Sequence, residues 1–377
     1  MNTEKSDENA STADAYSHVR PTSVSYDAAL DGWRAISILL VLTSHGGMKH
    51  LIPGGLGVTV FFFISGFLIT SLLLTEFERE HNISLKKFFL RRFWRLFPPV
   101  FVYIGISTGL IVLLNGEISP YEPIAALLYF ANYYSILWGF SPISGVGSPL
   151  NILGSLAVEE HYYIFFAPVV AILAYTRLRL LGCLVLLLIV PLMIRCWIIF
   201  SHDIQSSSIN YVYMATETRI DSIAWGALLA WLCHYINAKN LDRFLDNNCS
   251  LVASFCIFIF CLLYRAEWFR ESFRYSLQGI AMMPLFYSSL KGSALSLFKK
   301  VLGNSILVFI GRISYSIYLY HWLAIMIANA WFGTESLSIR WLVTFYSLSL
   351  VFSYASFCFL EIPSLIFRQR YGSHAVR

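Results

Sequence analysis

The sequence predicts an all-α, polytopic membrane protein with about ten transmembrane helices and both termini in the cytoplasm. Composition predicts the class, since 57% of the 377 residues are hydrophobic and only 13% are charged, whereas soluble domains carry roughly 25% charged residues. Loops rich in Lys and Arg alternate with loops that hold few, which predicts the orientation. The net charge of +5 is modest and its basic residues cluster at segment ends, so we expect no nucleic-acid partner.

Apolar segments of spanning length recur along the whole chain. They cover residues 33–50, 56–75, 98–115, 150–175, 179–200, 220–237, 250–264, 273–290, 304–332 and 338–360. Each is long enough to cross a bilayer as a helix, alone or with its flanks. A further apolar stretch, 122–140, follows the third segment, and its sequence fits a span, a re-entrant segment or an interfacial helix.

The basic residues favour the ten-span arrangement. With the N-terminus inside, cytoplasmic loops such as 86–95 (KKFFLRRFWR) and 291–300 (KGSALSLFKK) are rich in Lys and Arg. The outside loops at 115–149 and 201–218 contain few. One outside loop, RAEWFRESFR at 265–274, breaks the pattern. An eleventh span would reverse every later loop, so we expect 122–140 not to cross.

The ends of the chain differ from this membrane domain, which we place at 26–365. Residues 1–25 are polar and lack a basic segment followed by an apolar core, so we predict a flexible cytoplasmic tail and no signal peptide. Residues 366–377 form a short basic cytoplasmic tail. The seven Cys include no C-x-x-C pair, and we expect reduced thiols, no disulfide framework and no metal site.

The first apolar segment, LDGWRAISILLVLTSHGG, carries two ionisable side chains, Arg34 and His45. Eleven residues correspond to about 1,100° and ~16 Å along a helix, so both lie on one face. Intramembrane ionisable residues usually face a bundle interior or a water-filled cavity. The alternatives are that Arg34 is a lipid-facing anchor and that His45 ends the helix at the outer surface.

Two later segments also carry polar groups at membrane depth. In NILGSLAVEEHYYIFFAP, Glu159 and Tyr163 are four residues apart and share a face. Arg219 and Asp221 open the sixth span. Each set has a simpler interpretation, as polar residues at a helix end in the membrane interface.

The ninth span, GRISYSIYLYHWLAI, places Tyr315, Tyr318 and His321 three residues apart along one side of the helix. The alternative is a tyrosine-rich packing face with one satisfied histidine. In KKFFLRRFWRLFPP, Arg92 and Arg95 are three residues apart, so a helix presents them together. They fit either a membrane anchor or a site for a phosphorylated ligand, because guanidinium matches phosphate geometry.

Six sequence motifs, in one order over about residues 27–363, resemble those of the acyltransferase family 3 membrane enzymes, which O-acylate sugars, polysaccharides and some small molecules. The motifs are LDGWRAISILLVLTSH, GVTVFFFISGFLIT, RRFWRLFPP, SLAVEEHYYIFFAP, RIDSIAWGALLAW and ISYSIYLYHW. Gly154 stands where the family often has Trp, and His161 and Tyr162 replace its Gln-Phe. Some members carry a C-terminal esterase-like domain, which we expect to be absent here.

The resemblance implies transfer of an acyl group, usually acetyl, from cytoplasmic acyl-CoA to a hydroxyl of a carbohydrate or lipid-linked sugar. Acyl-CoA is then a co-substrate, no cofactor is bound, and the chain sits among lipids of the bacterial cytoplasmic (inner) membrane. Arg92 and Arg95 would receive the donor phosphates, with Arg34 guiding the donor inward. His45 would act as general base on the acceptor or carry the acyl group, and Glu159 would orient it.

The remaining polar side chains are expected to line the site, with Tyr315 and His321 on the acceptor side. The other candidates are Tyr163, Arg219, Asp221 and Tyr318. Two other classes also place ionisable residues in a membrane core. A proton-coupled transporter commonly shows inverted repeats and paired broken helices, neither of which the sequence displays. A lipid-linked-sugar binding or flipping protein would not consume acyl-CoA.

Overall fold

The computed structural model describes residues 27–48, 52–114, 116–141, 147–201, 205–333 and 338–370. Every regular element in these ranges is a helix, which confirms the predicted all-α class. The predicted N-terminal tail, 1–25, lies outside the described residues, as does most of the predicted C-terminal tail.

A long helix, or a bent pair of helices, overlaps each of the ten apolar segments. These helices are α2 (Ala28–Thr43), α3 (Gly54–Glu80), α4 (Leu85–Leu113), α7 (Leu153–Leu173), α8 (Arg177–Ser201), α10 (Thr216–Tyr235), α12 (Asn248–Leu263), α14 (Arg274–Leu290), α17 (Ser314–Phe332) and α18 (Ile339–Ser356). Shorter helices connect or extend them: η1 (Ser44–Met48), α5 (Tyr121–Leu127), α6 (Ala131–Leu137), η2 (Pro149–Ile152), α9 (Ser206–Met214), α11 (Ala238–Leu245), α13 (Glu267–Glu271), α15 (Ser296–Leu302), α16 (Ser305–Arg312), η3 (Phe357–Glu361) and α19 (Ile362–Arg370).

Length and apolarity qualify part of this set as membrane spans. Within the described residues, five helices are long and apolar enough to cross a membrane, or up to seven if the bent pairs α11–α12 and α16–α17 each count as one. The remaining long helices are shorter or more polar: α2 has 16 residues, α14 has 17, and α10 opens with Glu217, Arg219 and Asp221. The chain is a multi-pass membrane protein, and the count of ten stays a prediction.

The stretch 122–140 forms two short helices, α5 and α6, of seven residues each. At ~1.5 Å per residue each is ~10 Å long, so neither crosses a bilayer. Tyr129, between them, has a left-handed backbone with φ of 54°, a conformation that residues other than glycine seldom adopt. The turn at Tyr129 folds α5 and α6 into separate segments.

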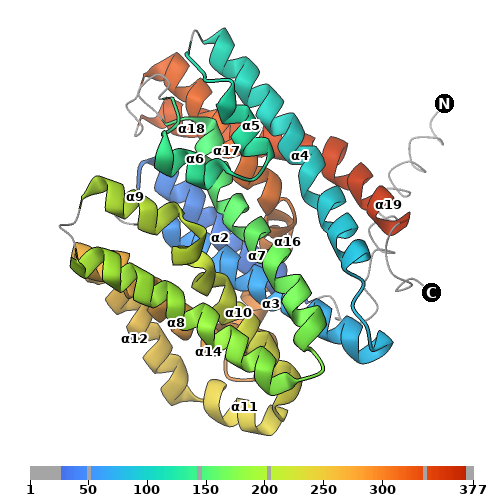
Figure 1. Ribbon diagram of the computed structural model, residues 1–377. Coiled ribbons are helices and arrows are strands. Elements are labelled where there is room, and N and C mark those ends of the chain that lie inside the picture. Colours follow the sequence, from blue (N-terminus) through green and yellow to red (C-terminus); the bar gives the residue numbers. More distant parts are fainter. Residues whose placement is uncertain are drawn as a thin grey trace.

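The helices form one bundle with α2 and α3 in its middle (Figure 1). Helices α4, α17 and α18 lie on one side of this pair, and α8, α12 and α14 lie on the other (Figure 1). A close crossing joins α3 to α10, where Gly66 and Gly226 face the opposite backbone. A Cβ at Gly66 would stand 1.9 Å from the Ile223 carbonyl oxygen, and one at Gly226 would stand 1.9 Å from that of Phe63. Small residues let membrane helices approach this closely.

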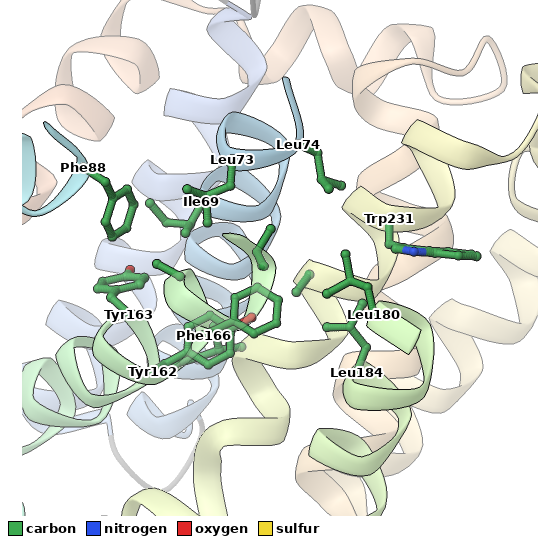
Figure 2. Close-up of a cluster of buried hydrophobic side chains, with 14 of the residues drawn as sticks. Ile69, Leu73, Leu74, Phe88, Tyr162, Tyr163, Phe166, Leu180, Leu184 and Trp231 are labelled. Carbon is green, nitrogen blue, oxygen red and sulfur yellow. The ribbon is translucent and has the colours of Figure 1, made fainter. Parts of the chain in front are cut away.

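A buried apolar cluster anchors α7 against four neighbouring helices. Figure 2 shows Tyr162, Tyr163 and Phe166 of α7 among side chains of α3, α4, α8 and α10. Tyr163 is 1% exposed. Because its neighbours pack around it, the polar residues one turn earlier on α7 are held at a fixed depth in the bundle.

Candidate active site

Two cavities adjoin inside the bundle. The basic cavity, of about 90 Å³, is lined by Arg34, Arg92, Arg95, Glu159, Tyr163 and Tyr315 among others. The histidine cavity, of about 330 Å³, is lined by His45, Ser44, Gly54, Gly55, Tyr213, Arg219 and Trp322 among others. Val58, Phe62, Ser155 and Tyr318 belong to the walls of both. Arg34 and His45, which the sequence predicts on one face of the first helix, therefore line two adjoining cavities.

The end of α2 places His45 on the cavity wall. Asp27 caps the start of the helix, accepting a hydrogen bond of 2.9 Å from the Ala29 amide. The helix then widens into the π-turn η1 and ends at Gly47, whose φ of 101° suits glycine. Ser44 Oγ accepts a hydrogen bond of 3.0 Å from the Gly54 amide, which holds the start of α3 against this turn.

The imidazole of His45 contacts two side chains of α17. His45 Nδ1 lies 2.9 Å from His321 Nε2, and the two ring planes are 5° apart. The Trp322 ring meets the His45 ring edge-on, at 5.0 Å between centroids and 89° between planes. These contacts fix the orientation of His45 from a helix that is far away in the sequence.

Glu159, which we expected to orient His45, lies on the basic cavity. Its Oε1 accepts a hydrogen bond of 3.1 Å from the Tyr163 hydroxyl. The hydrogen-bond partner of His45 is instead His321. The Arg92 guanidinium lies 3.8 Å above the Tyr163 ring, a cation–π contact that ties α4 to α7.

The three predicted arginines converge on the basic cavity. Arg34 pairs with Asp31 at 3.0 Å, and the same carboxyl lies 3.7 Å from Arg312 Nε. Arg92 and Arg95 reach the cavity from α4. Arg92 Nε is buried and finds no hydrogen-bond partner among the described residues. The cavity is thus lined by three arginines and one carboxylate, Glu159, a charge balance that suits an anionic ligand.

Tyr315 and Tyr318 of α17 lie at different places along the two cavities. The Tyr315 hydroxyl donates to the Leu96 carbonyl at 2.9 Å, and Tyr315 lines the basic cavity. The Tyr318 hydroxyl lies 2.5 Å from Ser155 Oγ and donates to the Ile152 carbonyl at 3.1 Å. Since Ser155 and Tyr318 line both cavities, this pair stands where they meet.

The side chains of Arg219 and Asp221 have different surroundings, although the residues are only two positions apart in the sequence. Arg219 lines the histidine cavity, donates to Thr59 Oγ1 at 3.2 Å and lies 3.9 Å from the Tyr275 ring. Asp221 lines neither cavity and forms a two-contact ion pair with Arg195, at 2.7 and 3.0 Å. Both partners of that pair are fully buried.

Sequence reasoning missed Arg195 and Trp322. Arg195 had a visible signal, since it is a single charged residue inside the apolar run PLMIRCWII, where a buried charge requires a partner. Trp322 directly follows His321 in the sequence, but no local pattern distinguishes it from an interfacial aromatic residue. Its contact with His45 depends on how α17 packs against α2.

Comparison with known proteins gives a family match over most of the chain. Residues 27–358 match the model described as "Acyltransferase domain". A protein of Staphylococcus aureus (strain COL) named "Putative O-acetyltransferase SACOL0978" is 30% identical over 348 residues, which cover 90% of this chain and 57% of that protein. The O-acetyltransferase OatA of Staphylococcus aureus (strain NCTC 8325 / PS 47) is 28% identical over 345 residues, with the same coverage. The chain spans less than two thirds of the length of these relatives. No solved structure matches significantly.

Proposed function

This chain belongs to the acyltransferase-3 family, and on that premise we propose that it is a membrane-embedded O-acyltransferase. It moves an acyl group, most simply acetyl, from cytoplasmic acyl-CoA to a carbohydrate hydroxyl. The observation that carries the proposal is the meeting of the two cavities, one with three arginines and one with His45. The names of the two relatives above support O-acetyl transfer.

The basic cavity suits the phosphate-bearing part of the donor. Arg34, Arg92 and Arg95 line it from two helices, so their positive charges face one space. Guanidinium groups bind phosphate oxygens by charge-assisted hydrogen bonds. The thioester arm of acyl-CoA would then pass the Ser155–Tyr318 pair and bring its carbonyl carbon to His45.

The histidine cavity supplies the chemistry. A ring nitrogen of His45 takes the proton of the acceptor hydroxyl, and the hydroxyl oxygen attacks the thioester carbonyl carbon. The tetrahedral intermediate collapses, the C–S bond breaks, and the protonated His45 returns its proton to the leaving CoA thiolate. The acyl group has moved from CoA to the acceptor and one proton has moved from the acceptor to CoA, so the step needs no further reactant.

The start of α3 forms part of the same wall. Gly54 and Gly55 line the histidine cavity at the N-terminus of this 27-residue helix. The positive end of a helix dipole favours the negative oxygen of a tetrahedral intermediate. Arg219 faces the same cavity and adds a full positive charge to this environment.

The acceptor enters from the histidine cavity, which is the larger of the two. Its wall carries Tyr213 and Trp322, aromatic side chains that combine an apolar face with a polar edge. A sugar of a cell-surface polysaccharide or oligosaccharide, free or lipid-linked, fits such a wall. We place the protein in the bacterial cytoplasmic membrane, where acyl-CoA and the growing surface polymer are on opposite sides.

Membranes containing the wild type and His45→Ala test the proposal. We expect the wild type to release CoA from labelled acetyl-CoA and to add an acetyl increment to carbohydrate, detected by mass spectrometry. His45→Ala should lose both signals at equal protein content, since general-base catalysis contributes about 10²–10⁴-fold. His234→Ala is the matched control, because His234 pairs with Glu78 at 3.0 Å and lines neither cavity.

Two results contradict this function. Full activity in well-expressed His45→Ala would remove His45 from the chemistry. No consumption of acetyl-CoA or of longer acyl-CoA by the wild type, with the protein inserted, would favour a transporter or a sugar-flipping protein.

A further inference from the structure

His321 is held in one protonation form by the backbone of its own helix. The side chain is fully buried. Its Nδ1 lies 2.7 Å from the Tyr318 carbonyl oxygen and 3.2 Å from that of Ile317. Carbonyl oxygens only accept hydrogen bonds, so Nδ1 must carry the proton. In the neutral ring, Nε2 is then left with its lone pair.

That lone pair determines the protonation of His45. His321 Nε2 lies 2.9 Å from His45 Nδ1. Two lone pairs do not form a hydrogen bond, so His45 Nδ1 carries a proton and donates it. His45 Nε2 is therefore the unprotonated nitrogen, the one able to accept a proton from a hydroxyl.

The basic nitrogen of His45 lies beside Gly54, on the wall of the histidine cavity. A Cβ built on Gly54 would lie 3.9 Å from His45 Nε2, and Gly54 lines the histidine cavity. The edge-on contact with Trp322 and the hydrogen bond to His321 both oppose a flip of the ring. A flip would replace Nδ1–H by a C–H group and break the hydrogen bond.

We propose that His321 is a positioning residue. Because the Tyr318 carbonyl fixes the proton of His321 on Nδ1, His321 Nε2 accepts a hydrogen bond from His45 Nδ1, and His45 Nε2 stays unprotonated as the base. The inference rests on the proposed acyl transfer. His321 is uncharged in this role, taking the place that a carboxylate occupies in a catalytic triad. A neutral acceptor avoids the desolvation cost of a buried carboxylate, and it still stabilises the positive charge when His45 accepts the acceptor's proton.

Two substitutions separate polarity from packing. In His321→Gln, the amide oxygen can accept from His45 Nδ1, so we expect kcat within about tenfold of the wild type. His321→Leu fills similar space but accepts no hydrogen bond, so kcat should fall about 10²–10⁴-fold, the range that a misoriented or wrongly protonated catalytic imidazole loses. The KM values for acetyl-CoA and for the sugar should stay within about twofold, because His321 lines neither cavity.

Nitrogen-15 NMR of the wild type tests the same point without a substitution at His321. With imidazole-labelled protein and His45→Ala to assign the signals, His45 should show a protonated Nδ1 and an unprotonated Nε2. In the wild-type protein, a neutral His45 ring with the proton on Nε2 would overturn the proposal. Equal losses of kcat in His321→Gln and His321→Leu, in parallel with a loss of thermal stability, would overturn it as well.

Failure of this inference and failure of the proposed function give different results. If the wild type transfers acetyl, His45→Ala does not and His321→Leu does so at full rate, the function stands and His321 has no positioning role. If the wild type transfers no acyl group, the function itself is wrong, whatever the NMR spectrum shows.

Discussion

Two charged side chains, Arg195 and Asp221, form a structural contact in the bundle. The carboxylate receives two hydrogen bonds from the guanidinium and a third from Ser276 Oγ at 2.8 Å. Arg195 Nε donates to the Ser272 carbonyl at 2.9 Å. Such a pair, fully desolvated, is costly to break, since one partner is left as an uncompensated charge. Asp221 therefore has a structural role, in contrast to the site-lining role that the sequence suggested.

Asp221→Asn tests this structural role. We expect a loss of about 3–5 kcal/mol of stability, measured as a lower unfolding midpoint in detergent, with kcat per folded molecule unchanged. The double variant Arg195→Met/Asp221→Leu should recover part of the loss, because no buried charge remains. A stable Asp221→Asn protein with reduced kcat would return Asp221 to the site.

Arg92 and Arg95 have a different expected effect. Replacing both by Gln should raise the KM for acyl-CoA tenfold or more, which corresponds to about 1.4 kcal/mol, while kcat at saturating donor changes little. The reason is that the proposal assigns them to the donor's phosphates, and the Ser155–Tyr318 pair lies where their cavity meets that of His45. Initial-rate kinetics against acyl-CoA concentration measure the effect.

Arg179→Gln provides the matched control for that experiment. Arg179 is exposed near the start of α8 and lines neither cavity, so its loss should leave the KM unchanged. An unchanged KM in the Arg92→Gln/Arg95→Gln protein would make the two arginines membrane anchors, the alternative that the sequence left open.

At the scale of the helix, the features that depend on local periodicity could be predicted from the sequence. Apolar runs located the long helices, and the eleven-residue spacing predicted one helix face for Arg34 and His45, which line the two adjoining cavities. The partner of His45 could not be predicted in this way, because His321 is 276 residues away. Glu159 was a reasonable candidate orienter from residue type, yet the packing of α7 directs it to Tyr163 and the basic cavity.

The crossing of α3 and α10 gives a prediction about helix packing. Gly226→Ala places a methyl group against the Phe63 carbonyl, so the helices must separate, at a cost of about 1–3 kcal/mol. A lower unfolding midpoint and a lower yield of inserted protein measure this cost. Because both helices carry walls of the histidine cavity, acyl transfer should fall too.

Gly105→Ala on α4 is the control for this crossing. Nothing lies within 4 Å of a Cβ at Gly105, and alanine favours a helix over glycine by about 1 kcal/mol. We therefore expect unchanged or higher stability. If Gly226→Ala is as stable as Gly105→Ala, the close approach of α3 and α10 is not needed for the fold.

If the chain acts as proposed, its two cavities open toward opposite sides of the membrane. In the proposed function the donor is cytoplasmic acyl-CoA, so the basic cavity must be reached from the cytoplasm. This requirement depends on how many helices cross. The least apolar of the long helices, α10, is therefore the informative one, since it carries Arg219 and Asp221 and is not among the helices that qualify as spans by composition.

The sidedness of the two ends of α10 decides its topology. Ser207 lies before this helix, in the predicted outside loop, and Cys249 lies after it, at the predicted cytoplasmic end of α12; both are exposed. In single-cysteine proteins, a membrane-impermeant maleimide added to intact cells should label Ser207→Cys and not Cys249. Both should react after permeabilisation, which controls for reactivity.

A helix of 20 residues is ~30 Å long, enough to cross the hydrocarbon core. Its buried polar groups face Arg195, Thr59 and Tyr275 inside the bundle, so they need not face lipid. Labelling of both positions from outside would mean that α10 does not cross, and the ten-span arrangement would be wrong. Labelling of Cys249 alone would mean that the orientation is reversed, and the basic cavity could not receive a cytoplasmic donor.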